Sequence, residues 1–168
     1  MVKLTMVLFF IMSPIWPLGQ NPIPGDPFII INKTTNELAF FQKNELQHIY
    51  QVGTGRTDDL TPEGLFTVTV KAKNPYYRKL DIPGGDSNNP LGTRWIGFDA
   101  EETDGRIYGI HGTNRAESIG YYVSNGCVRM TNPSVEELFD RIPLGTKVLI
   151  INKTATFEEI AIEYQAVD

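Results

Sequence analysis

Residues 124–130 read Ser-Asn-Gly-Cys-Val-Arg-Met (SNGCVRM), and this stretch holds the only cysteine of the 168-residue chain. A single cysteine excludes an intramolecular disulfide, so Cys127 is either buried and inert or a reactive thiol. Gly126 lets the backbone approach a bound molecule closely, and the nearby amides could form an oxyanion hole. Arg129 could bind a carboxylate through two hydrogen bonds or form a structural ion pair.

A nucleophilic thiol needs a base, and the chain offers two histidines. His48 lies within a predicted strand, where we expect it to be a half-exposed residue without a partner. His111 ends an apolar run and precedes Gly112, sixteen residues before Cys127. If the intervening segment loops back, the imidazole could take the thiol proton or pair with the thiolate, while a backbone carbonyl holds its other nitrogen.

The chain around these residues is predicted to be mainly β. Short apolar or alternating runs bounded by turn residues are typical of strands, and two-residue turns such as Lys43-Asn44 join neighbouring strands. This pattern predicts a barrel or sandwich rather than a βαβ fold. The long polar segment 74–90 contains three prolines and two glycines, and such loops in a small domain are often functional. The expected strands are 28–31, 37–42, 45–52, 65–70, 95–98, 107–110 and 146–151.

One helix is predicted in the C-terminal half. Asn132 is suited to cap it, Pro133 to take its first position, and Pro143 to end it. Val135, Leu138, Phe139 and Ile142 follow at the spacing of one apolar face.

The two ends of the chain lie outside this predicted domain. Residues 1–19 combine Lys3 with a short apolar run and helix breakers, which is typical of a signal peptide or an N-terminal membrane anchor. A buried N-terminal strand or helix is the alternative. Residues 20–27 contain three prolines and a glycine and are predicted to be a linker. We predict a catalytic domain over residues 28–152 and leave the acidic tail 153–168 without an assigned structure.

Composition excludes some classes of function. The formal net charge is −5, and no basic run or zinc-finger spacing suggests a nucleic-acid partner. One cysteine and one suitably placed histidine are too few ligands for a zinc site, so no metal or cofactor is expected. A serine triad lacks the Gly-x-Ser-x-Gly motif that would support it.

The segment from His111 to Asn114, followed by Ser124 to Met130, resembles the signature of the YkuD-type L,D-transpeptidases. Asn125 stands where that family usually has a histidine, but the base of the family corresponds to His111. The resemblance covers about residues 28–152. Residues 52–55, 61–66, 91–95 and 143–146 also resemble landmarks of the family, in the family's order.

The resemblance implies a YkuD-like sandwich or barrel in the bacterial cell envelope that makes 3→3 peptidoglycan cross-links through a Cys127 thioester and releases D-Ala. It implies that His111 is the base, that the Gly112 carbonyl orients it, and that the Gly126 and Cys127 amides hold the oxyanion. Peptidoglycan stem peptides would be donor and acceptor, and carbapenems would be covalent inhibitors. The candidate substrate-binding residues are Ser124, Asn125, Arg129, Tyr108 and Trp95, and Tyr76 and Tyr77 could also line the cleft. Packing in the core is the commoner role for a residue such as Trp95 or Tyr108.

Five alternatives stay open. The protein could be an L,D-carboxypeptidase, if water attacks the thioester, or could attach a protein amine to the wall. It could be a non-catalytic peptidoglycan-binding module, although such a module is expected to lose His111 or Cys127. It could be a cysteine peptidase for ordinary peptides, or an exported structural domain with a buried thiol.

Overall fold

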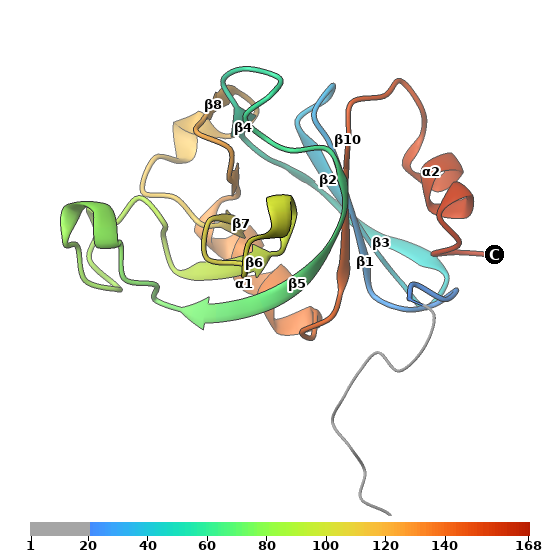
Figure 1. The fold of residues 1–168 in the computed structure, drawn as a ribbon, viewed down its shortest axis with the longest axis horizontal. Coiled ribbons are helices and arrows are strands. Elements are labelled where there is room, and N and C mark those ends of the chain that lie inside the picture. The colour runs from blue at the N-terminus through green and yellow to red at the C-terminus, as the bar shows by residue number, and fades with distance from the viewer. Residues whose placement is uncertain (1–20) are drawn as a thin grey trace, which may run out of the picture.

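A mixed sheet of eight strands curls around one face of an amphipathic helix in the computed structural model, which describes residues 21–168 (Figure 1). The predicted signal peptide or anchor, residues 1–19, lies outside the described residues. The strand order is β3-β2-β1-β10-β5-β6-β7-β9, and β4 and β8 form a separate two-stranded sheet. The strands are β1 (Phe28–Asn32), β2 (Glu37–Gln42), β3 (Glu45–Gln51), β4 (Thr54–Gly55), β5 (Gly64–Lys73), β6 (Arg94–Phe98), β7 (Tyr108–His111), β8 (Tyr122–Ser124), β9 (Val128–Arg129) and β10 (Lys147–Ile151).

The mainly β prediction is confirmed, and all seven expected strands are present within a few residues of their predicted bounds. Lys43 and Asn44 have φ values of 57° and 65°, as a tight two-residue hairpin turn between β2 and β3 requires. Three short strands, β4, β8 and β9, were not predicted. Each has two or three residues, which is too short for a periodic pattern to show in the sequence.

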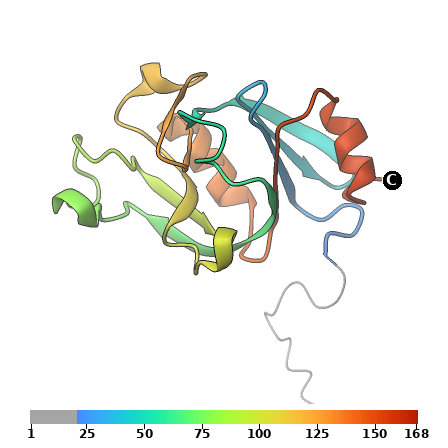
Figure 2. The same cartoon turned by 45° about the horizontal axis from the view of Figure 1, so that its top comes forward.

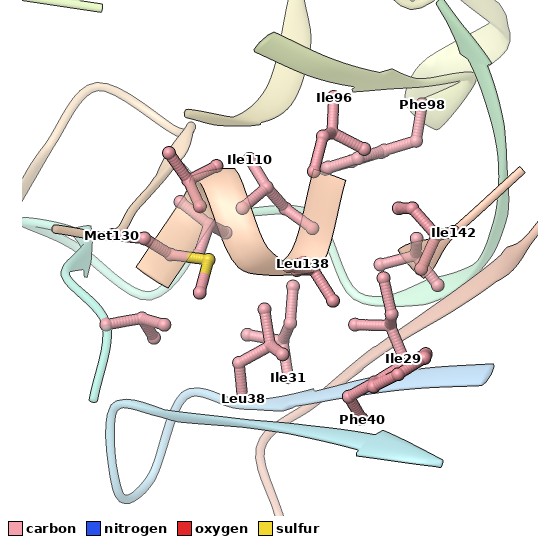
Figure 3. Close-up of a cluster of buried hydrophobic side chains, with 14 of the residues drawn as sticks. Ile29, Ile31, Leu38, Phe40, Ile96, Phe98, Ile110, Met130, Leu138 and Ile142 are labelled. Carbon is pink, nitrogen blue, oxygen red and sulfur yellow. The ribbon is translucent and has the colours of Figure 1, made fainter. Parts of the chain in front are cut away.

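Strand β1 is apolar from Phe28 to Ile31 because both of its faces are buried. Ile29 and Ile31 point into the main core inside the curl, whereas Phe28 and Ile30 point to a second core on the outer face. Strands β2 and β10 divide their side chains in the same way. Figure 3 shows Leu138 of the helix between the β1–β2 side and Ile96 and Ile110 of the opposite side.

The helix inside the curl is α1 (Asn132–Arg141), as the sequence predicts, but its cap differs. Thr131 is the capping residue, and its side-chain oxygen accepts a hydrogen bond from the amide of Ser134. The predictions that Asn132 caps the helix and that Pro133 takes its first position are therefore each wrong by one residue. Asn132 is the first helical residue, and its side chain is engaged by two loops described below.

A second helix, α2 (Phe157–Glu163), occupies the acidic tail, so the expectation of one helix needs correction. Thr156 and Glu159 form a capping box at its start, and Phe157, Ile160 and Ala161 cover the outer core. The turned view in Figure 2 shows α2 lying against the β1–β2 side of the sheet, far from α1. The apolar spacing and capping box were visible in the sequence, but the helix is only seven residues long.

The described part of the predicted linker lies against the folded domain. The Asn21 side-chain amide donates to the Gly145 carbonyl, and the Gly25 amide donates to the Ala166 carbonyl. Within residues 21–168, no helix combines the length and the hydropathy that a membrane span requires.

Candidate active site

Parallel pairing of β7 with β9 brings the two ends of the signature together. Ile110 lies opposite Val128 and His111 lies opposite Arg129. Ile110 and Val128 point into the main core. Since side chains alternate along a strand, His111 and Arg129 point to the outer face of this part of the sheet, and Cys127 directly precedes β9. The segment between His111 and Cys127 does loop back, as the catalytic interpretation of the sequence requires.

His111 is held as a neutral, oriented imidazole. It is 4% exposed, its Nδ1 lies 2.6 Å from the Gly112 carbonyl oxygen, and its ring stacks on Trp95 at 5.6 Å between centroids. Because Nδ1 faces a carbonyl, we assign the proton to Nδ1, which leaves Nε2 as the acceptor. Burial lowers the pKa of His111 to about 4, so the ring is neutral at pH 7.

Cys127 is partly buried, and its Sγ lies 3.4 Å from the carbonyl oxygen of Ile107. Burial raises the pKa of the thiol to about 11. Among residues 21–168 no hydrogen bond joins this thiol to the His111 imidazole. With pKa values of about 4 and about 11, both the imidazole and the thiol are neutral at pH 7.

The backbone before the thiol adopts a conformation that favours glycine. Gly126 has a φ of 130°, and a Cβ atom there would lie 2.6 Å from the Leu60 carbonyl oxygen. Its N–H donates to Oγ of Ser124 at 3.0 Å, and its carbonyl accepts from Thr61 Oγ1 at 3.0 Å. The Gly126 amide is thus already engaged, and Ser124 is a buried support of the loop.

A buried lysine, which the sequence analysis did not identify, supports the backbone around Gly126 through Thr61. Lys33 is 4% exposed, and its Nζ donates to the Asp58 carbonyl at 2.6 Å and the Thr61 carbonyl at 3.2 Å. It also lies 2.8 Å from a carboxylate oxygen of Glu63. Lys33 therefore holds Thr61, which in turn holds Gly126. Its sequence context, the repeated Ile-Asn-Lys-Thr, gave no sign of this role.

A cavity of about 450 Å³ opens at Cys127. Its walls come from β5, from the long loop after it and from the segment before β7. Trp95 forms part of the lining, and its Nε1 donates to the Gly105 carbonyl at 2.8 Å. The loop 74–90 that the sequence singled out as functional is therefore a wall of this cavity. Its lining residues are mostly apolar or aromatic and include Val70, Ala72, Tyr76, Tyr77, Leu91 and Ile107.

Arg129 has no acidic partner in the part of the chain that the structure describes. Its Nε is buried without a hydrogen-bond partner. Burial, and then the charge of Arg115, lower the pKa of Arg129, while Cys127 and Tyr77 act in the opposite direction. An unpaired guanidinium beside the thiol is suited to bind an anion.

The other predicted site residues lie near the thiol in different roles. Asn125 is exposed beside Cys127. The Tyr108 hydroxyl donates to a carboxylate oxygen of Glu101 at 2.6 Å, and this bond raises the pKa of Tyr108 to about 12. Tyr108 does not line the cavity. Residues 21–168 contain no cluster of three or more His, Cys, Asp or Glu side chains placed to hold a metal ion.

Comparison with known proteins identifies the family. The model of the YkuD family, described as the L,D-transpeptidase catalytic domain, matches residues 26–150. The chain belongs to the YkuD family. It is 65% identical over 159 residues to L,D-transpeptidase YqjB of Bacillus subtilis strain 168, covering 95% of this chain and 90% of that protein. It is 34% identical over 140 residues to L,D-transpeptidase YkuD of the same strain, covering 79% and 75%.

Solved structures of L,D-transpeptidases share the fold. The enzyme from Mycobacterium smegmatis superposes with a TM-score of 0.59 at 18% identity, covering 76% of this chain and 59% of that chain. LdtMt1 in complex with imipenem gives a TM-score of 0.59 at 17% identity, covering 76% and 59%. This chain therefore spans about three fifths of those two solved chains. The YkuD family is a family of acyltransferases that act on peptidoglycan in the cell envelope.

Proposed function

We propose that this protein is a peptidoglycan L,D-transpeptidase that forms 3→3 cross-links through a thioester on Cys127. The observation that carries the proposal is the pairing of β7 with β9, which places a buried, neutral His111 and the thiol on one face beside a cavity. The family, with its acyl-transfer chemistry, supplies the reaction class.

The first half of the reaction forms the thioester. The Cys127 thiol rotates away from the Ile107 carbonyl, gives its proton to Nε2 of His111, and Sγ attacks the carbonyl carbon of the third stem residue. The negative charge that develops on the carbonyl oxygen is stabilised by backbone N–H groups. We propose the Cys127 N–H as one donor. Because the Gly126 N–H is bonded to Ser124, it can serve as a donor only if that bond opens. The peptide bond to D-Ala then breaks, and the D-Ala amine leaves with the proton from His111.

The second half transfers the acyl group. An amine from a neighbouring stem peptide attacks the thioester carbonyl and gives its proton to His111. The carbon–sulfur bond breaks, and the thiolate takes that proton back. If water attacks in place of the amine, the product is a free carboxylate and the activity is that of an L,D-carboxypeptidase. The same thioester therefore leads to either product.

Intact-protein mass spectrometry tests this proposal directly. The protein is incubated with a disaccharide-tetrapeptide donor, with and without an acceptor stem, beside a Cys127→Ala variant. We expect release of D-Ala and an acyl adduct on the wild type, neither on the variant, and a cross-linked dimer when acceptor is present. A folded protein with a free thiol that releases no D-Ala would overturn the proposal. Imipenem, bound to LdtMt1 in the solved structure, is a second acyl donor to assay.

Arg129 is proposed to bind a carboxylate of the donor peptide. Replacing it with glutamine should lower kcat/KM for the donor about 10- to 100-fold, because a hydrogen-bonded charge contributes about 1.5–3 kcal/mol. Arg129→Lys keeps the charge but cannot form two parallel hydrogen bonds to one carboxylate. Its kcat/KM should therefore lie between the values of the wild type and Arg129→Gln. Equal kcat/KM for wild type and Arg129→Gln would show that this side chain only supports the loop.

Acylation should be insensitive to pH from neutral down to about pH 5 and should fall through about pH 4. His111 must be neutral to accept the proton, and its pKa is about 4, so acid removes the base. The measurement is kcat/KM for the donor against pH, which reports the free enzyme. A midpoint near the ordinary histidine pKa of about 6.5 would contradict the burial argument.

Protonation of His111 also lowers the stability of the folded state, so the pH profile of kcat/KM needs a control for unfolding. The unfolded chain binds a proton at about pH 6.5, whereas the folded chain binds it only near pH 4. The contribution of neutral His111 to stability is therefore present above about pH 6.5 and is lost as the pH falls to 4, a change of about 3 kcal/mol. Circular dichroism at each pH separates loss of the base from loss of the fold.

Export to the cell envelope follows from the proposed substrate, because peptidoglycan lies outside the cytoplasmic membrane. The apolar run in residues 1–19 favours this placement. Fractionation of cells that produce the full chain tests it, and recovery of the protein only in the cytoplasm would refute it.

A further inference from the structure

We propose that Asn132 is a positioning residue for His111, acting through the peptide group between Gly112 and Thr113. The inference rests on the proposed function, in which His111 is the base. Nothing in the sequence suggests this role, since Asn132 there has the features of a helix cap.

One peptide group connects the two side chains. The carbonyl of Gly112 lies 2.6 Å from Nδ1 of His111, and the N–H of Thr113 donates to Oδ1 of Asn132 at 3.2 Å. That carbonyl and that N–H belong to the same peptide, which is planar and trans, so they point in opposite directions. Fixing the N–H therefore fixes the direction of the carbonyl that orients the imidazole. Hydrogen bonding at the N–H also polarises the carbonyl and strengthens its bond to Nδ1.

The Asn132 oxygen also binds the loop on the other side of the site. The N–H of Thr93 donates to the same Oδ1 at 3.3 Å. The loop before Thr93 supplies Leu91, which lines the cavity and whose carbonyl lies close enough to His111 to favour the protonated ring. Asn132 thus links the cavity wall to the segment after β7.

The neighbouring backbone leaves room for this side chain. A Cβ atom on Gly112 would lie 2.1 Å from Oδ1 of Asn132, and so would a Cβ atom on Gly92. Asn132 itself is fixed, since it begins α1 directly after the capping residue Thr131. The Asn132 side chain can therefore occupy this position only because residues 92 and 112 are both glycine.

Other contacts keep the fold when the asparagine is changed. The Met130 N–H still donates to the His111 carbonyl at 2.9 Å, and the Gly112 N–H still donates to the Arg94 carbonyl at 3.2 Å. The Trp95 stack on His111 also remains. Loss of the Asn132 side chain should therefore leave the His111 ring free to change its orientation and tautomer, while the site stays folded.

Three variants of the full chain test the proposal. Asn132→Ala removes the acceptor. Asn132→Asp keeps an acceptor for both N–H groups and adds a charge. Thr131→Ala is the matched control, because it weakens the same helix end by removing the cap but leaves Oδ1 of Asn132 in place. Each variant is studied by ¹⁵N NMR of the histidine rings, with exposed His48 as internal reference, and by the single-turnover rate of Cys127 acylation by the tetrapeptide donor.

In Asn132→Ala we expect His111 to lose its fixed Nδ1-protonated tautomer and acylation to slow about 10- to 100-fold, as a small misplacement of a reacting group does. Asn132→Asp should keep the tautomer, restore most of the rate at pH 7 and move the acid limb to higher pH. Thr131→Ala should lower the melting temperature and keep the rate.

Two results would overturn the inference. One is an Asn132→Ala protein with the wild-type tautomer and rate. The other is an equal loss of rate in Thr131→Ala at an equal loss of melting temperature, which would reduce the effect to helix stability. If the wild type itself is not acylated, the proposed function fails, and the NMR comparison still decides the role of Asn132.

Discussion

His111→Gln is expected to slow acylation of Cys127 by about 10²- to 10⁴-fold, the usual contribution of a positioned general base. Glutamine can occupy part of the space of the ring beside Trp95, but it cannot accept a proton near neutral pH. The thiol, with a pKa of about 11, is then left without a group to deprotonate it. The measurement is the rate of adduct formation with the tetrapeptide donor by mass spectrometry.

His48→Gln provides the matched control, since it makes the same substitution at an exposed position of β3. Its ring contacts Tyr50 at 4.3 Å between centroids and does not line the cavity at Cys127. We expect the wild-type rate in this variant. Acylation of the His111→Gln protein at the wild-type rate would show that another group, or water, takes the thiol proton.

Ile160→Ala should destabilise the protein by about 2–5 kcal/mol, the cost of removing a large apolar side chain from a packed core. Ile160 is 1% exposed and packs in the outer core with Phe28, Ile30 and Leu149. This loss is a large share of the 5–15 kcal/mol that holds an ordinary domain together. Denaturant unfolding of the variant measures it as a lower midpoint at an unchanged slope.

Ile162→Ala changes the same residue type two positions away in the same helix. Ile162 is 55% exposed, so we expect a change within about 0.5 kcal/mol. Similar stabilities for the two variants would mean that α2 contributes nothing to the outer core. The large difference we expect would make residues 153–168 an integral part of the domain, although the family match ends at residue 150.

The main strands could be predicted because the residue types in each strand follow from which of its faces are buried. Strand β1 is apolar at its first four positions since it separates two cores, and β5 combines apolar residues with threonines at a half-exposed surface. The short strands β4, β8 and β9 exist because of pairing with distant partners, which no local pattern encodes. Strand β9 in particular is defined by β7 on one side and by Gly53 on the other.

The proposed catalytic pair could be predicted from residue types and order, but the supports around it could not. Cys127 and His111 carry chemistry that few other residues offer, so a lone thiol and a strand-end imidazole are visible in the sequence. Asn132 and Lys33 are ordinary polar residues whose importance depends on which backbone groups come within reach after folding. The contact between Tyr108 and Glu101 likewise withdraws a predicted substrate-binding residue from the cavity lining.

The protonated resting state of Cys127 has a consequence if the protein is exported, as proposed, to a compartment less reducing than the cytoplasm. The thiolate, rather than the thiol, is the nucleophile that reacts with peroxides and other electrophiles. With a pKa of about 11, only about one resting molecule in ten thousand carries a thiolate at pH 7. A low-pKa cysteine in the same place would be oxidised to sulfenic acid, and the chain has no second cysteine to resolve it. The raised pKa should therefore protect the proposed nucleophile from oxidation while no donor peptide is bound.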